Sequence, residues 1–284
     1  GNKVRKLEYC AADALAHGAD VLITCGGPQS NHARATAAVA AKLGLECHLV
    51  LNGMPSASPD GNLFLDFLFG ARVTFIPVPD LREQDESMEE IAEEYRSQGR
   101  RPYTIPLGAS DALGSLGYVD AMGEIAEQVG RSGPALDRIV FSCGSGGTLA
   151  GIVAGSLVHG LDCRVTAMSV AFPASWLDGK VDEVFSDLRE RYIPGLPDPH
   201  DKYEVFDGYI GEGYGKASPD LIGFIKEAAS LEAVLLDPTY TAKALFGLKK
   251  EIEKGSIGAD ERILFIHTGG VFGLFPFRDR FHLE

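Results

Sequence analysis

Short apolar segments rich in β-branched residues alternate with longer helical patterns along most of the chain, and this alternation limits the possible folds more than any other feature. Each apolar segment has the length and composition of a strand that is buried on both faces of a parallel sheet. The alternation predicts repeated βα units, and therefore an α/β fold built from open, mostly parallel twisted sheets flanked by helices. The expected strands are Val21–Cys25, Cys47–Leu51, Arg72–Pro77, Tyr103–Pro106, Arg138–Cys143, Arg164–Val170, Tyr203–Phe206 and Arg262–His267.

Helical patterns fill the intervals between these strands, and the alanine-rich segment Ala33–Leu43 has the strongest helix propensity. A chain of 284 residues exceeds the usual size of one hydrophobic core, so one large or two modest domains are expected. The turn Leu107–Ser110 precedes a long amphipathic segment and is the expected domain boundary. The expected helices are Lys3–His17, Ser30–Leu43, Gly61–Phe69, Met88–Gln98, Leu116–Gln128, Thr148–His159, Pro219–Glu232 and Thr241–Lys254.

The charge balance and the cysteines argue against several kinds of partner. The chain carries 26 Lys and Arg against 40 Asp and Glu, a net charge of -14, and such a surface repels nucleic acids and anionic lipids. The five cysteines form no C-x-x-C pair, so we expect neither a disulfide framework nor a metal site. No apolar run approaches the roughly 20 residues that span a bilayer, and no signal-peptide pattern is present. We therefore expect a cytoplasmic protein without nucleic-acid or membrane partners.

A glycine-rich turn, Gly144–Thr148, follows an apolar strand and opens a helix. Its glycines allow backbone N–H groups to converge, and the helix N-terminus adds positive potential, so the turn can hold a phosphate. A tight turn without any ligand is an equal alternative. The turn is no P-loop, because no lysine follows Gly151, and no dinucleotide fingerprint, because Leu149 stands at the last glycine position. It is no nucleophile elbow around its serine, because Cys143 replaces the first glycine.

The polar segment Gln29–His32 follows another expected strand and starts the alanine-rich helix. Side chains at that end of a parallel strand point into the crevice where α/β proteins bind ligands. Ser30 or Asn31 could instead act only as a helix cap, which is the commoner use of such residues. Four consecutive polar residues exceed what a cap requires, so the segment is a candidate binding site.

Lys3 alone, at the basic start of a helix, would be interpreted as a solvated charge. Several motifs around it and farther along the chain occur in the order and approximate spacing of one enzyme family. On these motifs the chain resembles the family of D-cysteine desulfhydrase and 1-aminocyclopropane-1-carboxylate deaminase, whose members use pyridoxal 5'-phosphate, have a tryptophan-synthase-β-like fold and carry a further N-terminal segment. The motifs are Gly1–Glu8, Gln29–Arg34, Gly144–Thr148, Asp237–Thr241 and His267–Gly270.

The resemblance implies that Lys3 carries the cofactor as a Schiff base and that Asn31 hydrogen-bonds its phenolic oxygen. It implies that Gly144–Thr148 holds the phosphate, with help from Lys6, and that the Thr241 hydroxyl lies beside the pyridine nitrogen. The implied cofactor-binding residues are Lys3, Lys6, Asn31, Cys143, Gly144, Ser145, Gly146, Gly147, Thr148 and Thr241.

The resemblance also implies the residues that face the substrate. Tyr214 and Tyr240 match two family tyrosines near the reacting carbons, although a tyrosine after a proline in a loop is more often a packed ring. The implied catalytic residues are Lys3, Ser30, Tyr214 and Tyr240. The implied substrate-binding residues are Gln29, Ser30, Asn31, His32, Tyr214, Tyr240 and Thr268.

Thr241 and Thr268 stand where the deaminases of the family have a glutamate and a leucine, and so favour the desulfhydrases. A hydroxyl stabilises a protonated pyridine less than a carboxylate does, and expelling a thiol needs a weaker electron sink than opening a cyclopropane. We therefore expect β-elimination of D-cysteine to pyruvate, hydrogen sulfide and ammonia. Lys3 is the expected α-proton base, with Ser30 as the alternative, and Tyr240 or Tyr214 would protonate the sulfur.

Other activities remain open at this point. Within the family they are an L-cysteate sulfo-lyase and a 1-aminocyclopropane-1-carboxylate deaminase. From another class, the chain could bind pyridoxal phosphate or a small anion without turnover. The resemblance further implies a homodimer, a smaller domain at residues 6–112, and a larger cofactor-binding domain at residues 1–5 and 113–284.

Overall fold

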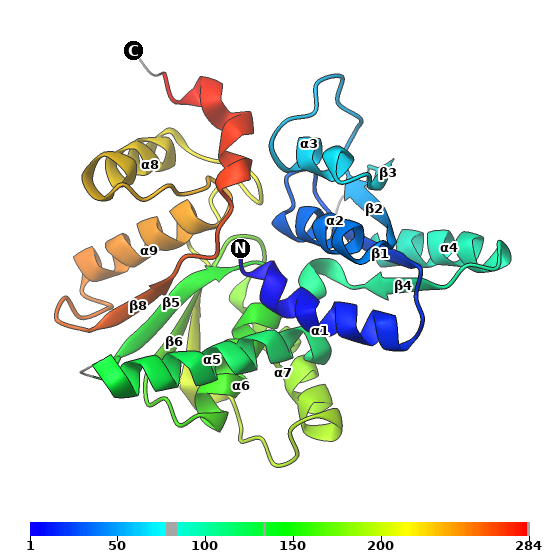
Figure 1. Ribbon diagram of the computed structural model, residues 1–284. Helices are drawn as coiled ribbons and strands as arrows, with labels where there is room; N and C mark the ends of the chain where they lie inside the picture. The colour runs from blue at the N-terminus through cyan, green and yellow to red at the C-terminus, as the bar shows by residue number, and fades with distance from the viewer. Residues whose placement is uncertain (78–83, 133–134, 283–284) are drawn as a thin grey trace.

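The computed structural model of the chain describes residues 1–77, 84–132 and 135–282 (Figure 1). Within them lie two four-stranded sheets, with the strand orders β3-β2-β1-β4 and β7-β6-β5-β8. Every recorded strand pair is parallel, which confirms the predicted α/β class. The strands are β1 (Val21–Gly26), β2 (Glu46–Asn52), β3 (Arg72–Ile76), β4 (Pro102–Ile105), β5 (Arg138–Cys143), β6 (Arg164–Ser169), β7 (Tyr203–Phe206) and β8 (Ile263–Ile266).

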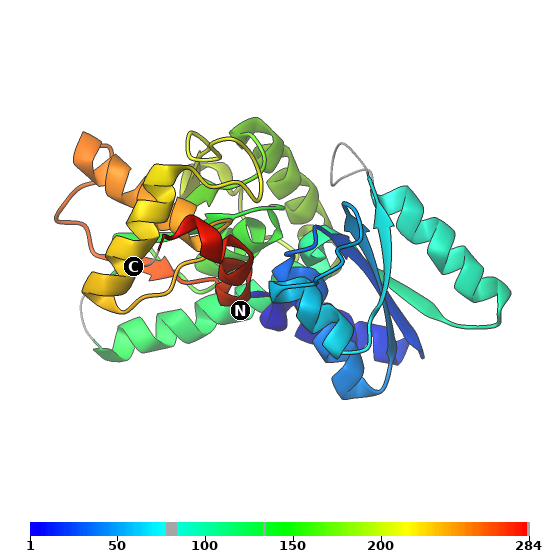
Figure 2. The same cartoon turned by 90° about the horizontal axis from the view of Figure 1, so that it is seen from above.

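Helices cover both faces of each sheet, as the two views in Figures 1 and 2 show. Every predicted helix is present, and the largest differences lie at the start of α4 and at both ends of α5. The helices are α1 (Lys3–Ala16), α2 (Asn31–Leu43), α3 (Gly61–Leu68), α4 (Gln84–Ser97), α5 (Ala112–Ser132), α6 (Gly147–Val158), α7 (Ala174–Arg191), α8 (Pro219–Glu232) and α9 (Thr241–Lys254). The 3-10 segments are η2 (Leu107–Ala109), η3 (His200–Lys202) and η4 (Val271–Arg280).

Helix α7 corrects the sequence prediction, which placed no helix between β6 and β7. Its buried side chains include Leu177, Val181, Val184 and Leu188. This spacing puts one apolar stripe along a helix, so the signal was present in the sequence. The segment η4 was not predicted either, and a proline at position 276 interrupts any regular helical pattern there.

The first sheet lies between two apolar layers that its strands supply by alternation. In β1, Val21, Ile23 and Cys25 pack with residues of α4. Leu22 points to the opposite face and joins the cluster that contains residues of α1, α2 and α3. This alternation of period two explains why the whole strand is apolar.

The second sheet is built in the same way. Ile139 and Phe141 of β5 pack in a cluster with residues of α5, α6 and α7, whereas Val140 packs with residues of α9 on the other face. The strand is therefore buried on both sides, and its carboxyl end at Cys143 leads directly into the glycine-rich turn.

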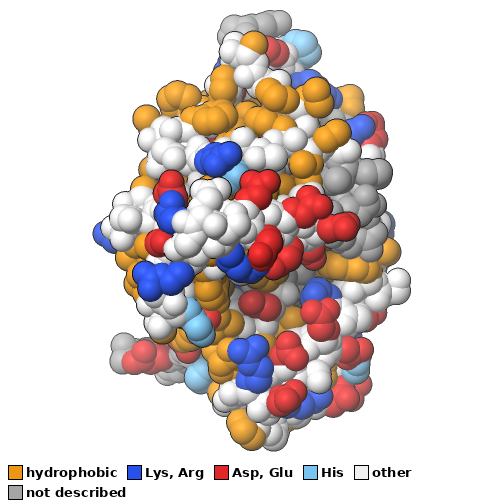
Figure 3. Space-filling model, turned by 90° about the vertical axis from the view of Figure 1, so that its right-hand side faces the viewer, with side chains coloured by type: hydrophobic (Ala, Val, Ile, Leu, Met, Phe, Trp, Pro, Cys, Tyr) orange, Lys and Arg blue, Asp and Glu red, His pale blue; other side chains and the backbone are white. Residues whose placement is uncertain are grey.

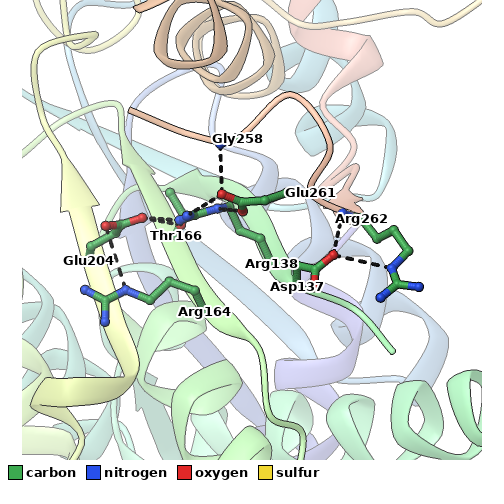
Figure 4. Close-up of polar contacts among 8 residues, drawn as sticks. All are labelled: Asp137, Arg138, Arg164, Thr166, Glu204, Gly258, Glu261 and Arg262. Atoms are coloured by element: carbon green, nitrogen blue, oxygen red, sulfur yellow. Dashed lines mark hydrogen bonds and ion pairs between the residues drawn. The ribbon is translucent and has the colours of Figure 1, made fainter. Parts of the chain in front are cut away.

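The amino ends of the second sheet's strands are joined by ion pairs and hydrogen bonds (Figure 4). Arg138 of β5 donates from Nε to Glu261 at 2.6 Å and from Nη1 to Thr166 of β6 at 2.5 Å, and it also pairs with Glu204 of β7. The Arg138 side chain is only 10% exposed. One guanidinium thus connects three strands and the loop before the fourth, at the end of the sheet opposite Cys143.

The surface around α4 is acidic. Figure 3 shows this side of the molecule, with acidic side chains gathered across its middle. The exposed carboxylates of α4 are Asp85, Glu86, Glu89, Glu90, Glu93 and Glu94.

Among the described residues, no helix combines the length and apolarity needed to cross a bilayer.

Candidate active site

A cleft lies where the carboxyl ends of β1 and β5 meet the start of α1. This is the edge at which open parallel sheets bind ligands. The space within it, open solvent included, is about 720 Å³. The residues that line it are Asn2, Lys3, Gly26, Gly27, Ser30, Asn31, His32, Leu107, Gly108, Ser142, Cys143, Gly144, Ser145, Gly146, Thr148, Ala171, Phe172, Tyr214, Tyr240 and Thr268.

Lys3 enters this cleft from the first turn of α1. Its Nζ lies 3.4 Å from the carbonyl oxygen of Gly108, and burial lowers the pKa of Lys3 to about 8. The turn that presents this oxygen is unusual, because Gly108 and its non-glycine neighbour Ala109 both have positive φ, 65° and 49°. Backbone strain of this kind concentrates at functional sites. The sequence interpretation treated this turn only as a domain boundary.

Lys6 lies one turn farther along α1 and is fully buried. Its Nζ donates to the same Gly108 oxygen at 2.8 Å and to the hydroxyl of Ser110 at 3.4 Å. Burial, and secondarily the charge of Lys3, lowers the pKa of Lys6 well below its usual value. Lys6 does not line the cleft but lies directly behind the glycine-rich turn, since a Cβ on Gly147 would stand 2.7 Å from its Nζ.

The glycine-rich turn forms one wall of the cleft. Gly146 has φ +83°, and α6 starts at Gly147, where a side chain has no room. The Ser145 hydroxyl lies 2.7 Å from that of Ser110, and Asn2 Nδ2 donates to Thr148 Oγ1 at 3.4 Å. Backbone N–H groups at the start of α6, the hydroxyls and the nearby Lys6 amine make this wall suitable for a phosphate.

The start of α2 forms the opposite wall. Ser30 is both the helix cap, accepting from the Ala33 N–H at 3.2 Å, and a lining residue, so the two interpretations of this serine hold together. His32 Nε2 lies 2.8 Å from the Thr24 hydroxyl, and burial and the charges of the two lysines lower the pKa of His32 well below its usual value. His32 is therefore a neutral group at physiological pH.

Gln29 is the one member of this polar segment that does not line the cleft. Its side-chain oxygen accepts from the Asn62 N–H at 2.9 Å, and its Nε2 donates to the Asp60 carbonyl at 2.9 Å. Gln29 thus ties the wall to the start of α3. Sequence pattern could not separate it from its three neighbours, because the difference arises from a tertiary contact.

Tyr214 and Tyr240 come from different segments and meet in the cleft. Their hydroxyls are hydrogen-bonded, and their rings are 5.8 Å apart in an edge-on arrangement. Burial raises the pKa of Tyr214 to about 12 and raises that of Tyr240 well above its usual value. Both phenols therefore keep their protons at neutral pH and can donate them.

The two threonines from which the desulfhydrase subfamily was predicted are placed differently. Thr268 lines the cleft, and its hydroxyl lies 2.8 Å from that of Ser142. Thr241 is fully buried outside the lining, where its hydroxyl donates to Asp237 Oδ1 at 2.9 Å and accepts from the Asp237 N–H at 2.9 Å. The structure therefore brings Thr268, but not Thr241, to the cleft.

The described lining contains no carboxylate, and Lys3 is its only lysine or arginine. Cys143 is buried, and burial raises the pKa of its thiol to about 12, so it is no thiolate nucleophile at neutral pH. Sequence reasoning missed several other lining residues, among them Gly26, Ser142 and Phe172. These are small or apolar groups whose types carry no chemical signal.

Comparison with known sequences covers nearly the whole chain. The family described as "Pyridoxal-phosphate dependent enzyme" matches residues 1–269. A putative 1-aminocyclopropane-1-carboxylate deaminase of Pyrococcus furiosus is 41% identical over 280 residues, which are 99% of this chain and 83% of the relative. A D-cysteine desulfhydrase of Yersinia pestis is also 41% identical, over 98% of this chain and 84% of the relative.

Comparison with solved structures agrees. A crystal structure of an ACC deaminase homologue superposes with a TM-score of 0.91 at 40% identity, covering 99% of this chain and 83% of that one. A threonine deaminase of lower identity, 18%, has a TM-score of 0.58 over 93% of this chain and 80% of its own, and shares the fold.

Proposed function

This chain belongs to the family of pyridoxal-phosphate dependent enzymes, and from that premise we propose that it catalyses β-elimination of D-cysteine, with water, to pyruvate, hydrogen sulfide and ammonia. The observation that carries this proposal is the composition of the cleft. Its described lining combines one amine with a hydrogen-bonded pair of protonated phenols and includes no carboxylate. Such a site can move a proton off carbon and onto a leaving group.

The residues present fit the cofactor. Gly147 packs directly against Ser110 and the Lys6 amine, so this buried amine lies immediately behind the turn whose backbone N–H groups can hold a phosphate. We propose that Lys3 binds the cofactor covalently, that Gly144–Thr148 and Lys6 hold its phosphate, and that Asn31 contacts its phenolic oxygen. When bound, pyridoxal phosphate withdraws electrons from the α-carbon of an amino acid, which acidifies the α-proton and allows a β-substituent to leave.

We propose Lys3 as the base that takes the α-proton. A pKa of about 8 leaves a substantial fraction of the amine neutral near physiological pH, and a neutral amine is needed to accept a proton. Ser30 remains the alternative. Its hydroxyl oxygen already accepts the Ala33 N–H, and this contact makes it less available as an acceptor.

The sulfur that leaves the β-carbon must be protonated to depart as hydrogen sulfide. Tyr240 and Tyr214 are suited to this step, because their raised pKa values keep both hydroxyls protonated and the hydrogen bond between them orients the pair. The second phenol can restore the proton that the first one gives up.

The lining also favours D-cysteine over the alternative substrates. The cysteate sulfonate would need a cationic partner besides Lys3, and the described lining offers none. Opening a cyclopropane needs the stronger electron sink that a carboxylate beside the pyridine nitrogen supplies, and no carboxylate lines the cleft among the described residues. This support does not depend on Thr241, which lies outside the lining.

The substrate assignment is tested by assaying sulfide from D-cysteine, sulfite from L-cysteate and 2-oxobutyrate from the cyclopropane amino acid. We expect sulfide, with equimolar pyruvate. Absence of sulfide would sink the D-cysteine assignment, and a cofactor absorbance band that D-cysteine fails to perturb would support the non-catalytic alternative.

The lysine assignment has its own test. Borohydride reduction and peptide mapping should place the cofactor on Lys3 and not on Lys6. Lys3→Ala should abolish the covalent adduct and sulfide release, whereas Lys42→Ala, an exposed lysine on α2, should leave both unchanged.

The wider organisation also remains a proposal. We propose a smaller domain at residues 6–112, which holds β1 to β4, and a larger one at residues 1–5 and 113–284, which holds β5 to β8. Helix α1 crosses the boundary between residues 5 and 6. We further propose a homodimer in the cytoplasm, which sedimentation and fractionation would test.

A further inference from the structure

Asn62 is a fully buried residue at the start of α3 that does not line the cleft. Its side chain nevertheless contacts the polar segment Gln29–His32, part of which lines the cleft. Asn62 Nδ2 donates to the Asn31 side-chain oxygen at 3.1 Å and to the Gln29 backbone carbonyl at 3.0 Å, and its Oδ1 accepts from Arg34 Nε at 3.2 Å. Asn62 thus stands directly behind Asn31 as seen from the cleft.

Two of these contacts fix which end of the Asn62 amide points where. A backbone carbonyl can only accept, so the Gln29 oxygen must face the NH₂ group of Asn62. The Nε–H of Arg34 can only donate, so it must face the amide oxygen. If the amide were reversed, its oxygen would face the Gln29 carbonyl oxygen and its NH₂ group would face the Arg34 Nε–H. Both hydrogen bonds would then be lost inside the protein, where an unsatisfied polar group is costly.

The orientation of the Asn62 amide determines the orientation of the Asn31 amide. The second N–H of Asn62 requires an acceptor, and that acceptor is Asn31 Oδ1. The two arms of an amide diverge, so the Nδ2 of Asn31 is directed away from Asn62, and Asn31 is a lining residue of the cleft. Asn31 therefore presents hydrogen-bond donors, and not an acceptor, to a ligand.

We infer that Asn62 is a positioning residue, which turns the Asn31 amide so that its NH₂ group faces an electron-rich oxygen of the bound cofactor. This inference rests on the proposed contact between Asn31 and the phenolic oxygen. Arg34 supports the arrangement from behind, where its guanidinium lies 5.4 Å from the centroid of the Phe272 ring. The chain of donors runs from Arg34 through Asn62 to Asn31.

Side chains of neighbouring residues hold the first backbone N–H groups of α3 in place. The Asn62 N–H donates to the Gln29 side chain, and Asp60 caps the helix through the Gly61 N–H at 2.7 Å. A Cβ at Gly61 would stand 2.6 Å from the carbonyl oxygen of Phe272 in η4, so the start of α3 also packs tightly against η4. Asn62 can therefore act as a fixed reference for Asn31.

The test is a double-mutant cycle read from the cofactor's absorbance. The pH midpoint of the visible band of the loaded protein reports how well the anionic phenolic oxygen is stabilised. A donor at that oxygen lowers the midpoint, because it favours the deprotonated form. We expect Asn31→Ala to raise the midpoint by about one pH unit, the size of one hydrogen bond to a charged group.

Asn62→Asp replaces the NH₂ group with an acceptor. Asn31 should then turn its own NH₂ group toward that carboxylate and its oxygen toward the cofactor, which should raise the midpoint by at least about one pH unit. In the Asn31→Ala background the same change should produce a much smaller shift, since only the added charge remains. Equal shifts in both backgrounds, or no shift with Asn31 present, would overturn the inference.

Two further variants keep the result interpretable. Asn62→Ala adds no charge and frees the Asn31 amide to adopt both orientations, so it should raise the midpoint by less than Asn62→Asp. Gln98→Glu makes the same amide-to-carboxylate change at an exposed residue just after the end of α4 and should leave the midpoint unchanged. A raised midpoint with Gln98→Glu would contradict the local explanation.

The outcome separates this inference from the proposed function. If D-cysteine yields no sulfide but the cycle behaves as expected, the substrate assignment fails and the role of Asn62 stands. If Asn31→Ala leaves the midpoint unchanged, the Asn31 contact and the role of Asn62 both fail, whatever the sulfide assay shows.

Discussion

The amines of Lys3 and Lys6 share one carbonyl acceptor but differ in access. Lys3 lines the cleft, whereas Lys6 is fully enclosed behind the glycine-rich turn. A cation without a carboxylate partner is costly to bury, and an anion in the adjacent cradle would repay this cost. This difference in access agrees with the separate roles proposed for them, Lys3 binding the cofactor covalently and Lys6 helping to hold its phosphate.

Loading of the cofactor should depend on pH through Lys3. The neutral amine is the nucleophile toward the cofactor's aldehyde, and its pKa is about 8. We expect the uptake rate of cofactor-free protein to rise as the pH increases through about 8 and then to level off. Stopped-flow absorbance after mixing with pyridoxal phosphate measures this rate, and a pH-independent rate would contradict the expectation.

Gly147→Ala should weaken cofactor binding. The new Cβ would lie 2.6 Å from Ser110 Cα and 2.7 Å from Lys6 Nζ, so the backbone of the turn proposed to hold the phosphate must move. We expect the dissociation constant to rise at least about tenfold, or roughly 1.4 kcal/mol, measured by equilibrium titration. Gly179→Ala on α7 meets nothing within 4 Å and should leave binding unchanged.

At the scale of elements, glycines inside α5 explain its close contact with α1. A Cβ on Gly117 would overlap the Arg5 backbone carbonyl and would stand 2.9 Å from the backbone nitrogen of Lys6. Helix α1 carries both lysines, so this close approach sets their position relative to the second sheet. Glycine is unfavourable in a helix interior, and here the packing against α1 accounts for it.

Gly117→Ala should therefore destabilise the protein by about 1–3 kcal/mol, the usual cost of overpacking. Gly130 lies in the same helix with nothing within 4 Å of a Cβ, so Gly130→Ala should be neutral or stabilise by up to about 1 kcal/mol. Urea unfolding midpoints would compare the two. Equal losses would show that helix propensity, and not contact with α1, determines the effect.

The same glycines show where sequence reasoning stops. The strands could be predicted because burial on both faces leaves an unmistakable apolar run, as in Arg138–Cys143. The start of α5 was predicted at Leu116, four residues late, because Gly114 weakens the helical pattern there. Helix α7 was predictable from its apolar stripe and was overlooked.

The site divides in a similar way. The glycine-rich turn could be predicted as an anion site from its own residues, whereas Lys3 was found only through the ordered family motifs. Asn62 could not have been found from sequence, because its role depends on hydrogen bonds to residues about thirty positions away. No periodicity or motif links those positions.

At the scale of the whole molecule, the second sheet is secured at the end away from the cleft. The Arg138 cluster in Figure 4 joins β5, β6, β7 and the loop before β8 at that end through hydrogen bonds and ion pairs. The cleft end can then consist of glycine-rich turns that contribute little packing. The contacts that stabilise the second sheet and the cleft thus lie at opposite ends of its strands.

Arg138→Leu should lower the free energy of unfolding by about 1–3 kcal/mol, since it leaves the partly buried carboxylates of Glu204 and Glu261 without their partner. Arg262→Leu, whose guanidinium is 52% exposed, should cost less than about 1 kcal/mol. Arg138 lowers the pKa of Glu261, so this stabilisation is present above the usual glutamate pKa and is lost as the pH falls through the lowered one. The difference between wild type and Arg138→Leu should therefore shrink in acid, as denaturation at several pH values would show.

The first residues of the chain and the last loop of the cleft depend on one another. The Asn2 N–H donates to the Thr268 carbonyl at 3.1 Å, and Asn2 also contacts Thr148. These contacts join the turn that carries Lys3 to two segments far along the chain, so the surroundings of Lys3 are complete only when the residues through Thr268 have folded. A polypeptide truncated before Thr268 would therefore keep Lys3 but lack part of the cleft that surrounds it.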